Sequence, residues 1–230
     1  MRIALFLLLA ALPAKATEPS PVLVELFTSQ SCSSCPPAEA NFRRLAARAD
    51  VVALEWHVDY WNDISVGADG RWRDPFSSAA NTERQRAYNL RLRRRATVYT
   101  PQAIINGATE TVGSRGAEID ALVAKAESDP SASLAIEKRG EGFSIDAAGP
   151  NGAELLFVRF VPSATTRVGG GENAGASLAE RNVVTRAETI ARLGAHAAQF
   201  AVKAPPAGER CAILLEAADG GPVYAARYCP

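Results

Sequence analysis

The chain has 230 residues, of which 25 are basic and 25 acidic, and 47% are hydrophobic. Proteins that bind nucleic acid usually need a strongly basic face, so this balance argues against that class, and we expect no nucleic-acid partner. The one basic run, Arg91 to Arg95, is predicted to end a helix, where cations interact favourably with the helix dipole.

Residues 1–16 are organised like a secretory signal peptide. Arg2 gives a positive start, Ile3 to Leu12 form an apolar core, and Ala14-Lys15-Ala16 is a small-x-small cleavage site. The core is too short to cross a bilayer, although an uncleaved membrane anchor is the alternative. Cleavage would leave about 214 residues with a net charge near −2 and no membrane span. We therefore expect a periplasmic or secreted protein.

The first half of the mature chain is predicted to be α/β. Strands are expected at 22–27, 51–58, 103–105 and 109–112, and helices at 36–49, 81–95 (or from 82) and 118–128. Asn106-Gly107 is a strong two-residue hairpin turn between the last two strands. The order is β-α-β-α-β-β-α with an irregular insert, 59–80, after the second strand. The first two strands, joined through a helix, should be parallel.

After Asp129-Pro130 the pattern changes to short apolar alternations separated by glycine and proline. They occur near 134–137, 143–146, 155–161, 181–193, 198–202, 211–217 and 223–228. The sequence therefore predicts an α/β domain at 17–130 and a smaller β-rich domain at 131–230. The Gly169-Gly170-Gly171 stretch lacks the spacing of a phosphate-binding loop and is interpreted as a flexible connection.

Cys32 and Cys35 lie three positions apart, between the first strand and the first helix. A helix N-terminus stabilises a thiolate, so Cys32 is expected to be the exposed attacking thiolate and Cys35 the resolving thiol. In an oxidising compartment, spacing favours pairing these two and leaves Cys211 with Cys229. Cys211 and Cys229 lie opposite each other on a predicted hairpin, as a structural disulfide. A static Cys32–Cys35 disulfide is the alternative to a redox pair.

The strand–CxxC–helix opening, and Thr100-Pro101 leading into a short strand that ends at Asn106-Gly107, resemble the thioredoxin fold. More closely, "VELFTSQSCSSCPPAE", "HVDYW", "DPF", "RQRAY" and "YTPQAIING" resemble a family of secreted bacterial thioredoxin-like proteins catalogued as a domain of unknown function. The resemblance implies a cis peptide bond before Pro101 and a substrate contact through the backbone of Thr100. The chain departs from ordinary thioredoxin at Ser33-Ser34, where thioredoxin has Gly-Pro.

Two further groups of residues are candidates for the site. Glu25, a carboxylate in an apolar strand, could accept the proton of Cys35, or could instead pair with an arginine. His57, Asp59 and Trp61 follow a strand end where α/β sheets bind ligands, and could tune the thiol or bind substrate. The alternative for this second group is an aromatic plug over the core with a hydrogen-bonded histidine.

These observations predict a thiol–disulfide oxidoreductase that needs no cofactor and acts on a protein or small-molecule thiol or disulfide. One rival is a protein that binds copper or another soft metal through Cys32, Cys35 and His57. A structural zinc site lacks the second CxxC that it would need. A redox-inert binding module is the remaining alternative.

Overall fold

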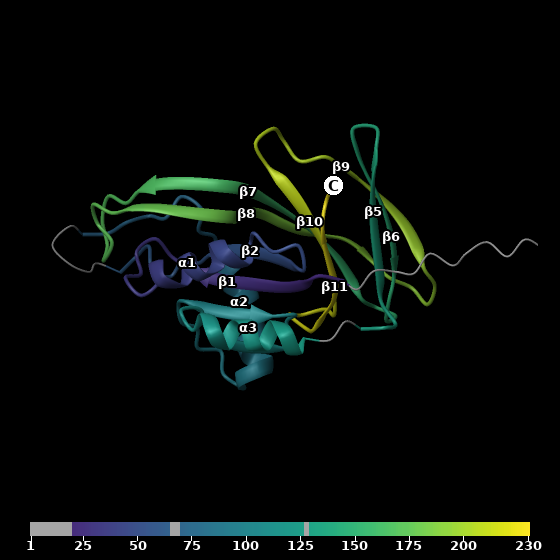
Figure 1. Ribbon diagram of the computed structural model, residues 1–230, viewed down its shortest axis with the longest axis horizontal. Helices are drawn as coiled ribbons and strands as arrows, with labels where there is room; N and C mark the ends of the chain where they lie inside the picture. The colour runs from purple at the N-terminus through teal and green to yellow at the C-terminus, as the bar shows by residue number, and fades with distance from the viewer. Residues whose placement is uncertain (1–19, 65–69, 127–128) are drawn as a thin grey trace, which may run out of the picture.

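The computed structural model describes residues 20–64, 70–126 and 129–230 (Figure 1). The predicted signal peptide lies outside the described residues. The helices are α1 (Pro36–Leu45), α2 (Ala79–Arg93) and α3 (Gly116–Lys125). The strands are β1 (Val22–Thr28), β2 (Val51–His57), β3 (Gln102–Ile105), β4 (Thr109–Val112), β5 (Ser133–Arg139), β6 (Gly142–Ala148), β7 (Glu154–Arg167), β8 (Ser177–Arg192), β9 (Ala198–Lys203), β10 (Arg210–Glu216) and β11 (Val223–Tyr228).

The architecture is mixed α/β, with one large mixed sheet and few helices. Eight strands form a sheet in the order β11-β10-β7-β8-β2-β1-β3-β4, and β5, β6 and β9 form a second sheet. The predicted order β-α-β-α-β-β-α is present from β1 to α3, and β1 and β2 are parallel as predicted. Strands from both sides of residue 130 share the large sheet, and the division into two domains stays a prediction.

The alternation of side chains along β1 separates the two faces of the large sheet. Leu23 and Phe27 face a core that includes Tyr88 of α2, whereas Val24 and Leu26 face a core that includes Phe42 of α1. Helix α1 therefore covers one face and α2 the other. This parity decides which polar side chains of β1 and β2 lie beneath α1.

The second sheet packs on the C-terminal strands of the first. Its Phe143 and Ile145 share a buried core with Leu155 of β7 and with the disulfide between Cys211 and Cys229. The Cα atoms of the two half-cystines are 5.3 Å apart, and the amide of the second donates to the carbonyl of the first. The predicted structural disulfide is confirmed.

The two-residue turn at Asn106-Gly107 contacts strands from both the beginning and the end of the chain. Asn106 and Gly107 have φ of 45° and 58°, the left-handed conformations that this hairpin turn requires. A Cβ on Gly107 would lie 2.6 Å from the carbonyl oxygen of Gly221, so only glycine fits. Asn106 also accepts from Leu23 and Val223, which fixes β11 against the β3–β4 hairpin.

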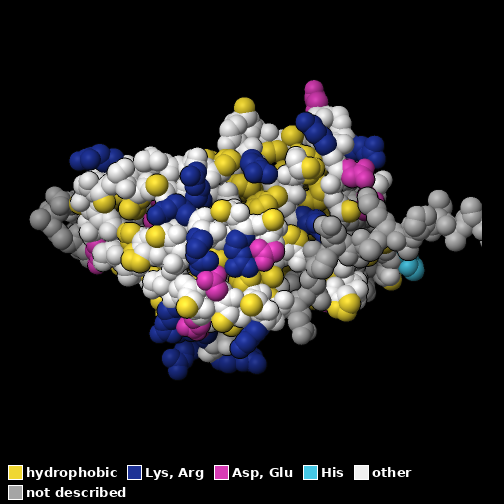
Figure 2. All heavy atoms as spheres, viewed as in Figure 1, with side chains coloured by type: hydrophobic (Ala, Val, Ile, Leu, Met, Phe, Trp, Pro, Cys, Tyr) yellow, Lys and Arg dark blue, Asp and Glu magenta, His cyan; other side chains and the backbone are white. Residues whose placement is uncertain are grey.

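Apart from the start of α1, the helix boundaries differ from the prediction by two to four residues, including the end of α2 at Arg93 and the start of α3 at Gly116. Helix α1 ends at Leu45 instead of Ala49, where the chain turns back toward the sheet. Helix α2 begins at Ala79 because the Ser78 hydroxyl caps it by accepting from the amide of Asn81. At the other end of α2, the C-cap residue Arg94 adopts the left-handed conformation. Basic side chains gather at the lower edge of the molecule, over α2 and α3 (Figure 2).

Among the described residues, no helix has both the length and the apolar character needed to cross a membrane.

Candidate functional site

The two cysteines lie where β1 passes into α1. The loop turns at Cys32, whose amide donates to the carbonyl of Ser29, and Cys35 is the N-cap residue of α1. Pro36 and Pro37 follow at the first helical positions, where no intrahelical donor is needed. Both cysteines are free thiols, with their sulfur atoms 2.6 Å apart. The position of the pair between a strand and a helix is the one that the sequence predicts, whereas the expected bond between Cys32 and Cys35 is absent and both are thiols.

The two thiols differ in acidity. The hydrogen bond from Cys35 lowers the pKa of Cys32 to about 6, against the effect of burial, and Ser34 and Thr100 add to the decrease. The Cys32 sulfur lies 3.1 Å from the Ser34 hydroxyl. Burial raises the pKa of Cys35 well above the usual value of a thiol, and its hydrogen bond to Cys32 raises it further. Both changes favour the thiolate form at Cys32 and the thiol form at Cys35.

Thr100, Pro101 and Trp61 lie together beside this pair. The Thr100–Pro101 peptide bond is cis, and the Thr100 carbonyl oxygen is 3.9 Å from the Cys32 sulfur. The indole nitrogen of Trp61 donates to the Thr100 hydroxyl at 2.7 Å. Gln85 of α2 holds the same segment by donating to the carbonyl of Tyr99 at 2.7 Å. Three of the predicted site residues are thus assembled next to Cys32.

The structure places Glu25 in a different environment, on the α2 face of the sheet. Its carboxylate accepts from Arg84 at 2.7 Å and from the Tyr88 hydroxyl at 2.5 Å, and the same arginine bridges to Glu216 of β10. Burial raises the pKa of Glu25, while Arg84 opposes the increase. Glu25 therefore pairs with an arginine, the second of the two interpretations of the sequence, and its contacts lead away from α1.

His57 and Asp59 also separate from the cysteines. His57 is fully buried, and its Nδ1 lies 2.7 Å from the Asp74 carboxylate. Burial alone would lower the pKa of His57, but the charge and hydrogen bond of Asp74 raise it to about 10. Asp59 accepts from the Thr82 hydroxyl at the start of α2. Within the described residues, no group of three histidine, cysteine or acidic side chains is arranged to hold a metal ion.

Beneath α1 lies a buried ionisable cluster, defined here as Glu39, Glu55, His57, Asp74 and Glu180. The Nε2 of His57 is 3.8 Å from Glu180 of β8, and the backbone amide of Arg181 donates to Glu55. The sequence pattern indicates no role for the four acidic members. Asp74 is the acidic residue of the "DPF" segment, which carried part of the family resemblance.

Within this cluster, Glu39 is the member connected to Cys35. Its carboxylate accepts from the Thr28 hydroxyl at 3.0 Å, and a hydrogen bond from that hydroxyl lowers the pKa of Cys35. Burial raises the pKa of Glu39 to about 7, His57 opposes the increase, and Cys32 adds to it. Glu39 lies one helical turn after Cys35 and three residues before Phe42, so helical periodicity could have identified it.

Another contact that sequence analysis missed comes from the tip of the β7–β8 hairpin. Glu172 accepts from the amide and the hydroxyl of Ser33 at 2.8 and 2.7 Å, and Asn173 donates to the carbonyl of Cys32 at 2.9 Å. Cys32 is 0% exposed, as is Cys35. The prediction that Cys32 is the exposed thiol is wrong, because segments distant in sequence cover it.

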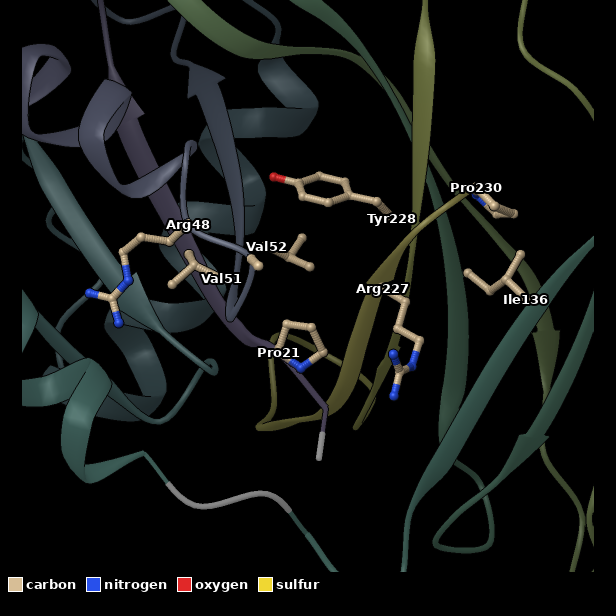
Figure 3. A pocket seen from close by; sticks show the side chains of 9 residues that line it. Pro21, Arg48, Val51, Val52, Ile136, Arg227, Tyr228 and Pro230 are labelled. Carbon is tan, nitrogen blue, oxygen red and sulfur yellow. The ribbon is translucent and has the colours of Figure 1, made fainter. Parts of the chain in front are cut away.

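A cavity of about 240 Å³ lies elsewhere, between the first residues of β1 and β2 and the C-terminal strands (Figure 3). Its lining includes Pro21, Val51 and Tyr228, with Arg48 on one side and Arg227 on the other. Because Cys32 follows the far end of β1, a strand of seven residues spanning about 23 Å separates this cavity from the cysteines.

Comparison with known proteins identifies the family. The family model described as "Protein of unknown function (DUF1223)" matches residues 23–216. The chain belongs to this family. The chain is similar to a protein from Agrobacterium tumefaciens whose crystal structure is known. The two sequences are 30% identical, the alignment covers 93% of this chain and 96% of the other, and the TM-score is 0.74.

HBP35 of Porphyromonas gingivalis is similar at a TM-score of 0.59, with 10% identity over 93% of this chain and 76% of its own. At that identity the likeness concerns the fold alone. No curated protein matches the chain. Membership of the family therefore leaves the chemistry to be argued from the site.

Proposed function

We propose that residues 20–126 form a thioredoxin-like unit, and that the protein is a thiol–disulfide oxidoreductase whose redox pair is Cys32 and Cys35. The observation that carries the proposal is the pair itself, two sulfurs 2.6 Å apart at the start of α1, facing a cis-proline segment. The parallel β1–α1–β2 connection and the opposite pKa changes of the two thiols support it.

In the reductive direction, the Cys32 thiolate attacks one sulfur of a substrate disulfide. A bond forms between that sulfur and Cys32, the substrate bond breaks, and the other substrate sulfur leaves as a thiolate. Cys35 then loses its proton and attacks the Cys32 sulfur, which releases the second substrate thiolate. The substrate gains two electrons, the cysteine pair loses two, and the released thiolates take protons from water. The reverse steps oxidise a substrate dithiol.

Glu39 is the positioning residue for the second step, because it acts on Cys35 through Thr28. The Thr28 hydroxyl has one hydrogen, which is directed either to the Glu39 carboxylate or to the Cys35 sulfur. As Cys35 attacks, its proton passes to the Thr28 oxygen while the hydroxyl hydrogen moves to Glu39. A carboxyl group with a pKa of about 7 is suited to accept and release that proton near neutral pH.

The proposal includes export and a thiol or disulfide substrate. The predicted signal peptide supports a periplasmic or secreted location, and the Cys211–Cys229 disulfide is consistent with an oxidising compartment. The cis-proline segment, with the Thr100 backbone beside Cys32 and Trp61 packed against it, is the proposed substrate-binding surface.

Disulfide exchange with insulin or a model peptide tests the proposal. Cys32→Ser should abolish exchange, whereas Cys35→Ser should accumulate mixed disulfides with the substrate. Wild-type exchange rates in both variants would contradict it. Titration of the reduced protein with Cu(I) tests the metal-binding rival, which predicts tight stoichiometric binding that is lost in His57→Ala.

A further inference from the structure

The tip of the β7–β8 hairpin, residues 168–176, rests on the loop that contains Cys32. Its Glu172 holds Ser33, while the side-chain amide of Asn173 donates to the carbonyls of Gln30 and Cys32 at 3.0 and 2.9 Å. Figure 1 shows why the tip reaches this loop, since β7 and β8 (green) extend leftward past the second sheet to the end of the molecule where α1 begins. The backbone of the loop is thus held by side chains about 140 residues away in sequence.

The contact between tip and loop is close. Gly171 has a φ of +72°, and a Cβ added to it would lie 2.9 Å from the Ser31 hydroxyl oxygen. The amide of Glu172 also donates to the Ser31 carbonyl at 3.2 Å. On its other side the loop meets the Thr100 carbonyl. The Cys32 loop is therefore held between the cis-proline segment and the hairpin tip.

With the hairpin tip resting on the loop, Cys32 cannot react with a substrate. Ser33 and Ser34 are exposed, yet Cys32 between the two segments is 0% exposed. A thiolate must reach within bonding distance of its target sulfur, so a substrate disulfide cannot meet Cys32 until one segment moves. The cis-proline segment is held from behind by Gln85 and Trp61, whereas the Glu172 contacts of the tip are exposed to solvent.

We propose that the hairpin tip is a cap that lifts from the Cys32 loop and thereby controls access to the thiolate. The Glu172 contacts are exposed to solvent and contribute little stability each, and the Asn173 contacts are two part-buried hydrogen bonds, so the tip can release the loop while β7 and β8 stay paired. The hinge is the base of the tip, where the amide of Val168 donates to the carbonyl of Ala176 and the amide of Gly175, at φ +79°, donates to the carbonyl of Val168. The inference rests on the proposed function only for what the uncovered thiolate then does.

Alkylation of Cys32 by iodoacetamide tests the cap without requiring catalysis. The protein is labelled at pH 8, where Cys32 is ionised, and the modified residue is identified by mass mapping. Gly171→Ala places a methyl group against Ser31 and should speed labelling of Cys32 about tenfold, which corresponds to about 1.4 kcal/mol. Gly152→Ala is the matched control, because it has a similar positive φ of +85°, has no atom within 4 Å of the added Cβ and lies outside the hairpin tip.

We expect Gly152→Ala to label within about twofold of the wild type, since it shares only the backbone strain. Equal rates in both glycine variants, or wild-type labelling as fast as an unhindered thiol of the same acidity, would overturn the cap. If Gly171→Ala fails to fold, the double variant Glu172→Gln, Asn173→Ala should give the same acceleration. Faster labelling without any disulfide exchange would keep the cap and refute the proposed function instead.

Discussion

Removing the Ser34 hydroxyl should make Cys32 less acidic. That hydroxyl lies 3.1 Å from the Cys32 sulfur and helps to lower its pKa to about 6 from the usual 9.0. A pKa of about 6 leaves about 90% of the thiol ionised at pH 7, against about 1% for an unperturbed thiol. A hydrogen bond to a charged group contributes about 1.5 kcal/mol, so Ser34→Ala should raise the midpoint of ionisation by about one pH unit.

The assay is the pH dependence of the iodoacetamide labelling rate of Cys32. At pH 6 the Ser34→Ala rate should be about fivefold below the wild type, and the two rates should converge above pH 9. Ser33→Ala is the matched control, because its hydroxyl donates to Glu172 and not to Cys32. Ser33→Ala can change the overall rate through the cap but should leave the midpoint unchanged. A wild-type midpoint above pH 8, or equal midpoints in Ser34→Ala and the wild type, would refute this reasoning.

Four further predictions separate catalytic from structural groups. Glu39→Gln should slow the release of mixed disulfides by roughly tenfold to a hundredfold in quenched-flow assays. Glu25→Gln, on the other face of the sheet, should leave that rate unchanged and lower the melting temperature by roughly 5 °C, because it weakens a buried ion pair; the reverse pattern would restore Glu25 as the proton acceptor. The charged pair of His57 should stabilise the fold fully below pH 6.5, and this contribution should be lost as pH rises through about 10; urea titrations should show a decline that His57→Gln lacks. Replacing Cys211 and Cys229 by alanine should cost about 3 kcal/mol, or roughly 10 °C, and keep exchange per folded molecule; loss of exchange in the folded variant would contradict a purely structural role.

Features that depend on neighbouring residues could be predicted from the sequence. The prolines after Cys35 mark the start of α1, Asn106-Gly107 specifies its turn through left-handed backbone conformations, and counting along one hairpin aligns Cys211 with Cys229. Each of these depends on rules that act over a few residues or within one hairpin. They were sufficient to locate the cysteine pair at the start of α1 and the structural disulfide.

The assignment of Glu25 as a proton acceptor illustrates where local patterns fail. An apolar strand with one carboxylate shows that the group is buried, but not which face it occupies. The face follows from the packing of α1 on Val24 and Leu26, which places Glu25 toward α2 and leaves Thr28 beneath the cysteines. Which of the two faces Glu25 occupies is decided only by the relative placement of α1 and α2.

The contacts of β7 and β8 with the site depend on pairing between distant segments. Glu180 belongs to the buried ionisable cluster, and Glu172 and Asn173 hold the Cys32 loop. Each lies about 140 to 150 residues away in sequence from the residue of the loop that it contacts. The glycine-rich stretch beside them resembles a flexible connection in sequence, because the residues that it packs against, Ser31 and Trp72, lie far away along the chain. For the same reason, the burial of Cys32 could not be predicted.

The reduction potential of the Cys32–Cys35 pair tests the proposed redox function most directly. Purified, metal-free protein is equilibrated in glutathione buffers of graded composition, and the free thiols are counted by alkylation and mass spectrometry. We expect a reversible two-electron couple between about −120 and −270 mV, the range of thiol–disulfide oxidoreductases, while Cys211–Cys229 stays oxidised. A Cys32–Cys35 disulfide that resists reduction below about −300 mV would be a static bond, and the oxidoreductase proposal would be wrong.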